Sequence, residues 1–104
     1  MKEKEVQFHG KSQEEIEGFP IKIREQFVQS IESIKYGFES NLRTKAMPEL
    51  GKGVIEIIKN GKPAYRVVYV IKGQTLHIIH AYNKTSTGTD KKHKELIKTR
   101  HKSL

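Results

Sequence analysis

Polar side chains interrupt the most apolar stretch of the chain, PAYRVVYVIKGQTLHIIHAYNK at residues 63–84. Arg66 lies inside one predicted strand, and His80, Tyr82 and Lys84 follow at alternate positions along the next. Glu56 stands in the strand before them. A guanidinium, an imidazole, a phenol and an ammonium group on one surface could bind a phosphate and move protons around it. These residues are the candidate catalytic residues.

Strand alternation predicts which way the candidates point. Successive side chains on a strand face opposite sides of the sheet, so all five candidates are expected on one face. By the same parity that face would carry an apolar floor of Val54, Val68, Val70, Leu76 and Ile78. The other face would pack against helices through Ile55, Ile57, Val67, Tyr69, Ile71, Ile79 and Ala81. His77 and His80, which are three positions apart, are expected to point in opposite directions.

Each candidate also has an ordinary structural interpretation. Arg66 could simply pair with Glu56 on the neighbouring strand, as cross-strand charges often do. His80 could be a hydrogen-bonded sheet residue, Tyr82 a residue at the rim and Lys84 a solvated strand end. From the residues alone, both the structural and the catalytic interpretation stay open.

The elements that must position these residues begin with a strand and two helices. Val6 and Phe8 alternate with polar neighbours at residues 4–9, which is the period of a half-buried strand. Ser12 followed by Glu15 has the spacing of a capping box, and Gly18 would end the short helix that it starts.

A second helix follows. Pro20 suits its first turn and Gly37 its end. Between them an apolar stripe at steps of four, four and three consists of Ile23, Phe27, Ile31 and Ile34.

Residues 38–53 have no sustained period and are predicted to be a loop. Three strands at about residues 54–59, 64–71 and 74–81 follow, with reversals at Asn60-Gly61 and Lys72-Gly73. A weakly apolar helix with Thr89 as its candidate cap ends the chain. The sequence therefore predicts one α+β domain over residues 1–104: an N-terminal strand and two helices packed on a twisted antiparallel sheet of about four strands, then a C-terminal helix.

The positive charge is concentrated in the second half of the chain. Residues 1–50 carry 8 basic and 9 acidic side chains, whereas residues 51–104 carry 12 and 3, which gives the net charge of +8. This asymmetry favours a polyanionic partner, nucleic acid before membrane, although a solvated basic tail is the simpler alternative. The basic side chains of the last helix, expected to contact RNA phosphates, are Lys91, Lys92, Lys94, Lys98, Arg100 and Lys102.

The sequence lacks the residues that several other classes of function require. The chain has no cysteine, which excludes disulfides and thiolate zinc sites and favours the cytoplasm. It shows neither an apolar run long enough for a membrane span nor a secretory signal. Its 5 histidines lack the spacing of a zinc protease, and no Walker loop or dinucleotide motif is present. No metal or cofactor is expected.

An ordered series of short motifs resembles the RelE/ParE superfamily of bacterial toxins, and within it the phage-related HigB branch. The series covers nearly the whole chain: Met47-Pro48-Glu49-Leu50, Gly53-Val54-Ile55-Glu56-Ile57, Tyr65-Arg66-Val67-Val68-Tyr69, His80-Ala81-Tyr82-Asn83-Lys84-Thr85 and Glu95-Leu96-Ile97-Lys98-Thr99-Arg100. The resemblance implies the toxin of a type II toxin-antitoxin system, a metal-independent and ribosome-dependent mRNA endonuclease. Cleavage would proceed by attack of the ribose 2'-hydroxyl on the adjacent phosphate.

The resemblance also implies roles and partners. Arg66 matches the phosphate-binding arginine, and Lys84 matches the basic residue beyond the last strand. His80 and Tyr82 match positions for proton transfer or base stacking, and Glu56 matches an acidic position of the branch. The implied partners are a helix-turn-helix antitoxin encoded next to the toxin, the ribosome with mRNA in its A site, and operator DNA through the antitoxin.

Two other functions are compatible with the same residues. A ParE-like protein would inhibit DNA gyrase by binding it, without catalysis. A plain nucleic-acid-binding module would use only the basic half of the chain.

Overall fold

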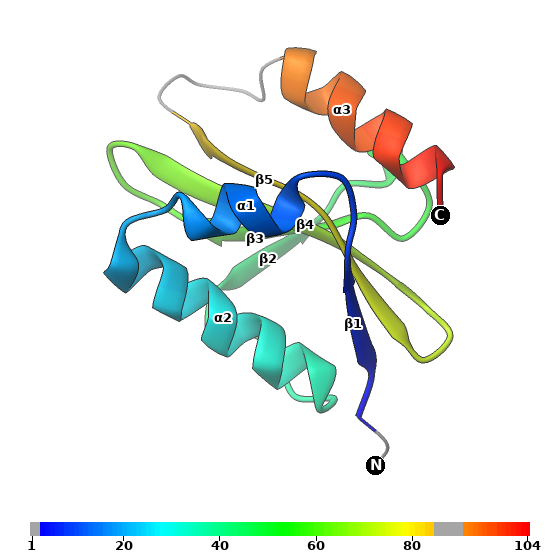
Figure 1. Ribbon diagram of the computed structural model, residues 1–104, viewed down its shortest axis with the longest axis horizontal. Helices are drawn as coiled ribbons and strands as arrows, with labels where there is room; N and C mark the ends of the chain where they lie inside the picture. Colours follow the sequence, from blue (N-terminus) through cyan, green and yellow to red (C-terminus); the bar gives the residue numbers. More distant parts are fainter. Residues whose placement is uncertain (1–2, 85–90) are drawn as a thin grey trace.

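The computed structural model describes residues 3–84 and 91–104. It contains a five-stranded sheet with helices on both faces (Figure 1). Its elements in chain order are β1 (Glu5–Phe8), α1 (Ser12–Glu17), α2 (Ile21–Lys35), β2 (Arg43–Ala46), the 3-10 turn η1 (Pro48–Leu50), β3 (Ile55–Lys59), β4 (Ala64–Lys72), β5 (Thr75–Lys84) and α3 (Lys91–Lys102). The strand order is β1-β5-β4-β3-β2. The predicted α+β class is confirmed.

Two features of the sheet differ from the prediction. The segment predicted to be a loop contains β2, which pairs antiparallel with β3 at the edge of the sheet. All four of its side chains are exposed, so it has no apolar period by which a strand could be recognised. The first strand also pairs in parallel with β5, whereas an antiparallel sheet was expected.

Helices α1 and α2 cover one face of the sheet. Phe27, Ile31 and Ile34 of the predicted stripe are buried there against Ile57 and Val67 of the strands. Each helix ends where a glycine was predicted to end it, α1 just before Gly18 and α2 two residues before Gly37. The phase of the apolar stripe is therefore enough to place this half of the core.

The predicted capping box at the start of α1 is wrong. Lys11 occupies the N-cap, and no side chain caps the helix there. The Ser12 hydroxyl instead donates a hydrogen bond of 3.0 Å to the carbonyl oxygen of Ile78. Glu15 accepts a hydrogen bond of 3.3 Å from the backbone N–H of Ala81. Both side chains thus attach α1 to β5, because backbone groups of β5 replace the local backbone partners of a capping box.

Helix α3 covers the opposite face of the sheet, as Figure 1 shows. Its Ile97 is completely buried. The cluster beneath the helix also contains Met47, Leu50, Val54, Val68, Val70, Ile79 and Tyr82. The predicted C-terminal helix is confirmed, while its candidate cap Thr89 lies outside the described residues. Within residues 3–84 and 91–104, no helix has the length and apolarity that crossing a membrane requires.

Candidate active site beneath the C-terminal helix

A β-bulge in β5 determines which side chains face α3. Val68 pairs with His80 and Tyr69 with Ile78, which leaves Ile79 as an extra residue. The predicted parity is therefore wrong before the bulge: Ile79 packs beneath α3, whereas Leu76 and Ile78 pack against α1 and α2. A bulge shifts the alternation by one position.

The same shift changes the relation between two histidines. His77 pairs with Val70 and His80 pairs with Val68, and both valines lie in the cluster beneath α3. His77 and His80 therefore share a face, contrary to the prediction. Beyond the bulge the predicted parity holds, because Arg66 pairs with Tyr82 and Ala64 with Lys84. Arg66, His80, Tyr82 and Lys84 thus lie on one face.

Glu56, Arg66 and Tyr82 form a buried polar cluster on that face. The Nε atom of Arg66 lies 3.3 Å from Oε1 of Glu56. The hydroxyl of Tyr82 donates a hydrogen bond of 2.9 Å to Oε2. The three residues are only 8%, 4% and 5% exposed, in the order Arg66, Glu56, Tyr82. The simple cross-strand pair is therefore present, and the phenol binds the same carboxylate.

Three aromatic rings stack beside this cluster. The centroid of the Tyr82 ring lies 5.3 Å from that of His80 and 4.2 Å from that of His93, and the two imidazole centroids are 5.0 Å apart, so the three rings form a triangle. The two histidines are also joined directly, since Nε2 of His80 lies 2.8 Å from Nδ1 of His93. His93 comes from the first turn of α3 and is half-buried, whereas His80 is 1% exposed. His93 is thus the outer member of the pair.

On its inner side His80 contacts a carboxylate and a guanidinium. Its Nδ1 lies 3.2 Å from Oε1 of Glu15 and 2.9 Å from Nη1 of Arg100. That Nη1 also lies 3.0 Å from both Glu15 Oε1 and the carbonyl oxygen of Ile79. A guanidinium nitrogen of this kind has two hydrogens, and these two acceptors use both. The Nδ1–H of His80 can then donate to Glu15, which leaves Nε2 to accept from His93.

The surroundings keep His80 neutral near pH 7. Burial lowers the pKa of His80 from its ordinary 6.5 to about 4, and Arg100 and His93 act in the same direction. The carboxylate of Glu15 opposes them. Because burial disfavours the charged imidazolium, His80 can serve as a proton acceptor or a positioning group rather than as a cation.

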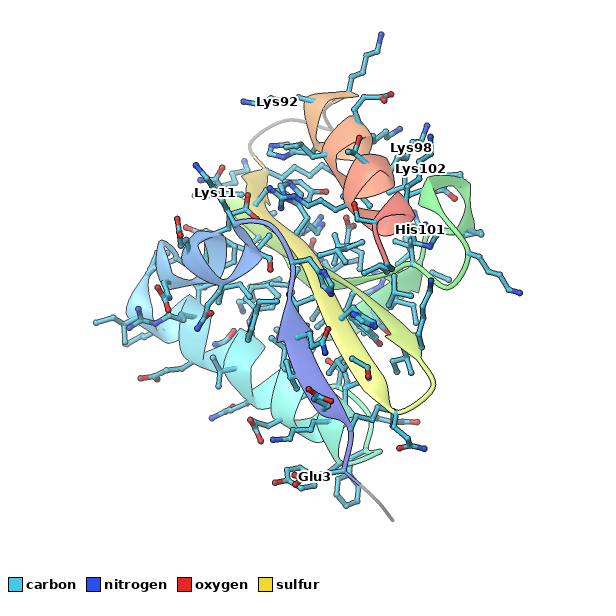
Figure 2. All side chains as sticks on the ribbon, turned by 45° about the vertical axis from the view of Figure 1, so that its right-hand side comes forward. Glu3, Lys11, Lys92, Lys98, His101 and Lys102 are labelled. Carbon is cyan, nitrogen blue, oxygen red and sulfur yellow. The ribbon has the colours of Figure 1, made fainter. Side chains whose placement is uncertain are left out.

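The predicted RNA-binding residues of α3 do not all lie together. Lys91, Lys94, Lys98 and Lys102 recur at steps of three, four and four, which places them along one stripe. Figure 2 shows Lys98 and Lys102 beside His101, while Lys92 extends from the other side of the helix.

Arg100 lies away from the lysine stripe. Its side chain is 16% exposed and is bonded inside the Glu15 network. It packs tightly against Gly10, where an added Cβ atom would come within 2.8 Å of its Nε. The structure thus places this predicted RNA contact at a half-buried position, where it attaches α3 to α1 and β5.

Reasoning from the sequence missed Glu15 and His93 as members of the site. Glu15 was assigned to a local cap, and His93 stands in a basic helix with no apolar neighbour of its own. The available signal was its helical phase, because His93 and Ile97 are four positions apart and therefore share the buried side of α3. Across the described ranges, no group of three or more metal-ligating side chains is arranged to hold an ion.

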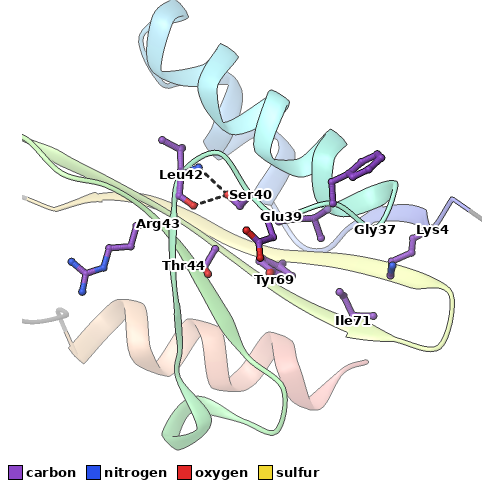
Figure 3. Close-up of a pocket in the computed structure, with 11 residues that line it drawn as sticks. Lys4, Gly37, Glu39, Ser40, Leu42, Arg43, Thr44, Tyr69 and Ile71 are labelled. Atoms are coloured by element: carbon purple, nitrogen blue, oxygen red, sulfur yellow. Dashed lines mark hydrogen bonds between the residues drawn. The ribbon is translucent and has the colours of Figure 1, made fainter. Parts of the chain in front are cut away.

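A separate hollow of about 580 Å³ opens on the other side of β4, between the end of α2 and β2 (Figure 3). Lys4, Arg43, Tyr69 and Ile71 are among its lining residues, and no candidate catalytic residue is. The candidate site is instead a set of polar groups enclosed by α3, open at His93 and at the half-buried Lys84.

The arrangement of the five-stranded mixed sheet and three helices in the described part of the chain is that of a small RelE-like α+β domain. Residues 14–102 match the model of the family described as Phage derived protein Gp49-like (DUF891), and the chain belongs to this family. The family is in the RelE/toxin-like group. No curated protein matches the chain significantly.

Proposed function

We propose that the protein is the toxin of a type II toxin-antitoxin system and cleaves mRNA on the ribosome. Membership of a phage-derived, toxin-like family supports the general class. The specific activity rests on one observation: His80, Tyr82 and His93 are stacked and hydrogen-bonded on the sheet face that carries Arg66. Cleavage of RNA by its own 2'-hydroxyl requires an acid-base pair and a phosphate-binding cation, and these residues supply both.

His93 is the candidate general base. Its Nδ1 bonds to His80, which leaves its Nε2 for the substrate, and it is the half-buried ring of the pair. Tyr82 is a weaker candidate because its hydroxyl already donates to Glu56. His80 and Glu15 behind His93 would hold the ring in position and share the proton that it takes up.

The proposed reaction has one bond formed and one broken. Nε2 of His93 takes the proton of the 2'-hydroxyl while the 2'-oxygen bonds to phosphorus. The bond from phosphorus to the 5'-oxygen breaks, and Lys84 donates a proton to that oxygen. Arg66 and Lys84 offset the negative charge that develops on the phosphate. The products are a cyclic 2',3'-phosphate and a free 5'-hydroxyl.

Mapping of transcript 5' ends after brief induction in bacterial cells tests this proposal. The parent protein should create new ends within translated codons. His93→Ala should reduce that cleavage by about 10²- to 10⁴-fold, the range for a lost acid-base group. His9→Ala is the matched control, since His9 is half-buried too but pairs with His77 away from the site.

Two outcomes would contradict the assignment. If the His93→Ala variant cleaves like the parent protein, and thermal unfolding shows that both are folded, His93 has no part in the mechanism. DNA damage without codon-specific ends would favour gyrase inhibition instead. The proposed antitoxin is tested in the same cells, because co-expression of the adjacent gene should restore growth and remove the new ends.

A further inference from the structure

A groove of about 500 Å³ lies at the opposite end of α3 from His93. It is lined by Lys52, Gly53, Val70, Ile71, Lys72 and His101. Three cationic or protonatable side chains and two apolar ones therefore surround it, and no acidic side chain is among them. The proposed cleavage reaction uses none of these residues.

The groove's polar groups come from three separate elements. Lys52 precedes β3, Lys72 is the last residue of β4, and His101 belongs to the last turn of α3. Tyr69 is the last residue of β4 that pairs with β3, so residues 70–72 extend beyond the first residue of β3 and line the groove. Elements distant in sequence thus bring positive charge to one place on the α3 face.

Contacts fix His101 in this groove. Its Nε2 donates a hydrogen bond of 3.0 Å to the carbonyl oxygen of Lys52. The imidazole lies against Gly51, where an added Cβ atom would come within 2.7 Å of the ring and where φ is +150°. A side chain at Gly51 would therefore displace the ring. His101 is held in place without a ligand, which lowers the entropy lost when one binds.

This lining suits a nucleotide of single-stranded RNA. Lysines bind phosphate as compact cations, and a base can lie on an apolar surface. The buried Val70 forms an apolar floor, and Ile71 contributes at the edge that the groove shares with the hollow on the other side of β4. The lysine stripe of α3 ends next to His101, as Figure 2 shows for Lys98 and Lys102. Lys94, Lys98 and Lys102 follow one another at about 6 Å along α3 at the helical rise, and such a row of lysines suits the repeated phosphates of RNA better than an acidic peptide.

The groove and the candidate active site lie along one line. Arg66, Val68 and Val70 alternate on the α3 face of β4, so Val70 is about 13 Å from Arg66 at the usual rise of a strand. His93 and His101 are separated by about 12 Å along α3 at the helical rise. The two lengths agree, so α3 connects the two places.

We propose that this groove binds a nucleotide of the substrate RNA at a distance from the scissile phosphate, with Lys52 and Lys72 on its phosphate. That the bound RNA is the substrate of the cleavage reaction rests on the proposed function, while the affinity of the groove for RNA does not. The lysine stripe guides the strand between the groove and His93.

The test measures binding of a fluorescent single-stranded oligouridylate to purified protein as a function of salt concentration. The double variant Lys52→Gln/Lys72→Gln should bind at least tenfold more weakly at low salt. The slope of log affinity against log salt should fall by about 1.4, since single-stranded RNA contributes about 0.7 for each phosphate contact. Lys22→Gln/Lys62→Gln removes the same charge from exposed positions elsewhere and is the matched control.

The possible results separate this proposal from the cleavage proposal. Equal slopes for the two double variants, with equal thermal midpoints, would overturn the groove even if the parent cleaves mRNA. A reduced slope in a protein that never cleaves would support the groove and reject the endonuclease. If the double variant does not fold, Lys72→Gln alone should lower the slope by about 0.7. Displacement of the RNA by polyglutamate at equal charge concentration would indicate an acidic protein partner and overturn the proposal.

Discussion

The two faces of the same sheet are built from different chemistry. The face beneath α1 and α2 buries an almost wholly apolar cluster, with Phe27, Ile57 and Val67 fully enclosed. The face beneath α3 also buries apolar residues, but it encloses Glu56 and Arg66 among them. A buried ion pair is often no more stabilising than a well-packed apolar replacement. Stability alone therefore accounts for the first face and not for the second.

This difference indicates where selection for function would act. The first face needs only apolar side chains at the right period, and many sequences satisfy that. The second face holds charges and imidazoles that must all be paired to offset the cost of their burial. Variants that remove one feature from each face compare the two.

The largest effect on stability is expected on the apolar face. Phe27→Ala should lower the free energy of unfolding by about 3 to 5 kcal/mol, since a fully buried aromatic ring leaves a cavity behind. Urea denaturation measures the change. The neighbouring Val28 is exposed, and Val28→Ala should change stability by about 0.5 kcal/mol or less. Equal losses for the two variants would show that α2 does not pack as described.

On the α3 face the ion pair should behave as a unit. Arg66→Met leaves the Glu56 carboxylate buried beside Tyr82 alone and should cost about 3 kcal/mol, the lower end for breaking a buried pair. Adding Glu56→Gln should recover part of that loss, because no uncompensated charge then remains. Urea denaturation of both variants measures this coupling.

The pair of the half-buried Lys35 and the exposed Glu3 provides the contrast to this buried pair. Lys35→Met should cost about 1 kcal/mol or less, since solvent screens exposed charges. A double variant less stable than Arg66→Met would contradict the pairing on the α3 face.

Acid should weaken the α3 face through His80. Its pKa is about 4 in the folded protein and 6.5 ordinarily, so the unfolded chain binds more protons between these values. The contribution of the neutral His80 to stability should be fully present above pH 6.5. The free energy of unfolding should then fall by about 3 kcal/mol as the pH drops to 4. Burial is the largest cause of the lowered pKa of His80; of the groups that face this imidazole, Arg100 and His93 add to the shift and Glu15 opposes it.

Urea denaturation of the parent and of His80→Gln across this range checks that expectation. The variant should lose most of the slope of stability against pH between 4 and 6.5. An unchanged slope would assign the acid sensitivity to other groups.

The sequence predicted the apolar face better than the polar one for a physical reason. The stripe from Ile23 to Ile34 follows the helical period, which is a local property and survives any tertiary arrangement. The bulge at Ile79 interrupts the alternation of apolar and polar residues, since Ile78 and Ile79 are adjacent between His77 and His80. Two adjacent isoleucines also fit a strand that is buried on both faces, and no glycine marks the position, so the pattern alone did not identify a bulge. The side-chain directions before the bulge were accordingly wrong.

The members of the site divide in the same way. Arg66, Tyr82 and Lys84 lie beyond the bulge, so parity was enough to place them on one face. Glu15 and His93 come from helices on opposite sides of the sheet and reach His80 only in the folded chain. The spacing of His93 to Ile97 places His93 on the buried side of α3, but it does not identify His80 as its partner. Motif resemblance could indicate the strand residues, while the helical partners required three-dimensional structure.

The smallest effect compares two tyrosines, one on each face. Tyr82→Phe removes the hydrogen bond to Glu56 and should cost about 1 to 2 kcal/mol, because the acceptor is a buried carboxylate. Tyr69, which lines the hollow beside β2 (Figure 3), is buried as well, but its hydroxyl group has no hydrogen-bond partner among the described residues. Tyr69→Phe should therefore change stability by about 0.5 kcal/mol or less, since no hydrogen bond is lost. Both variants keep the ring and its packing, so the difference between them isolates the hydroxyl group. Thermal unfolding monitored by circular dichroism resolves a difference of this size. Equal midpoints for the two variants would mean that the phenol contributes nothing to the buried cluster, and Tyr82 would then act only through the stack with His80 and His93.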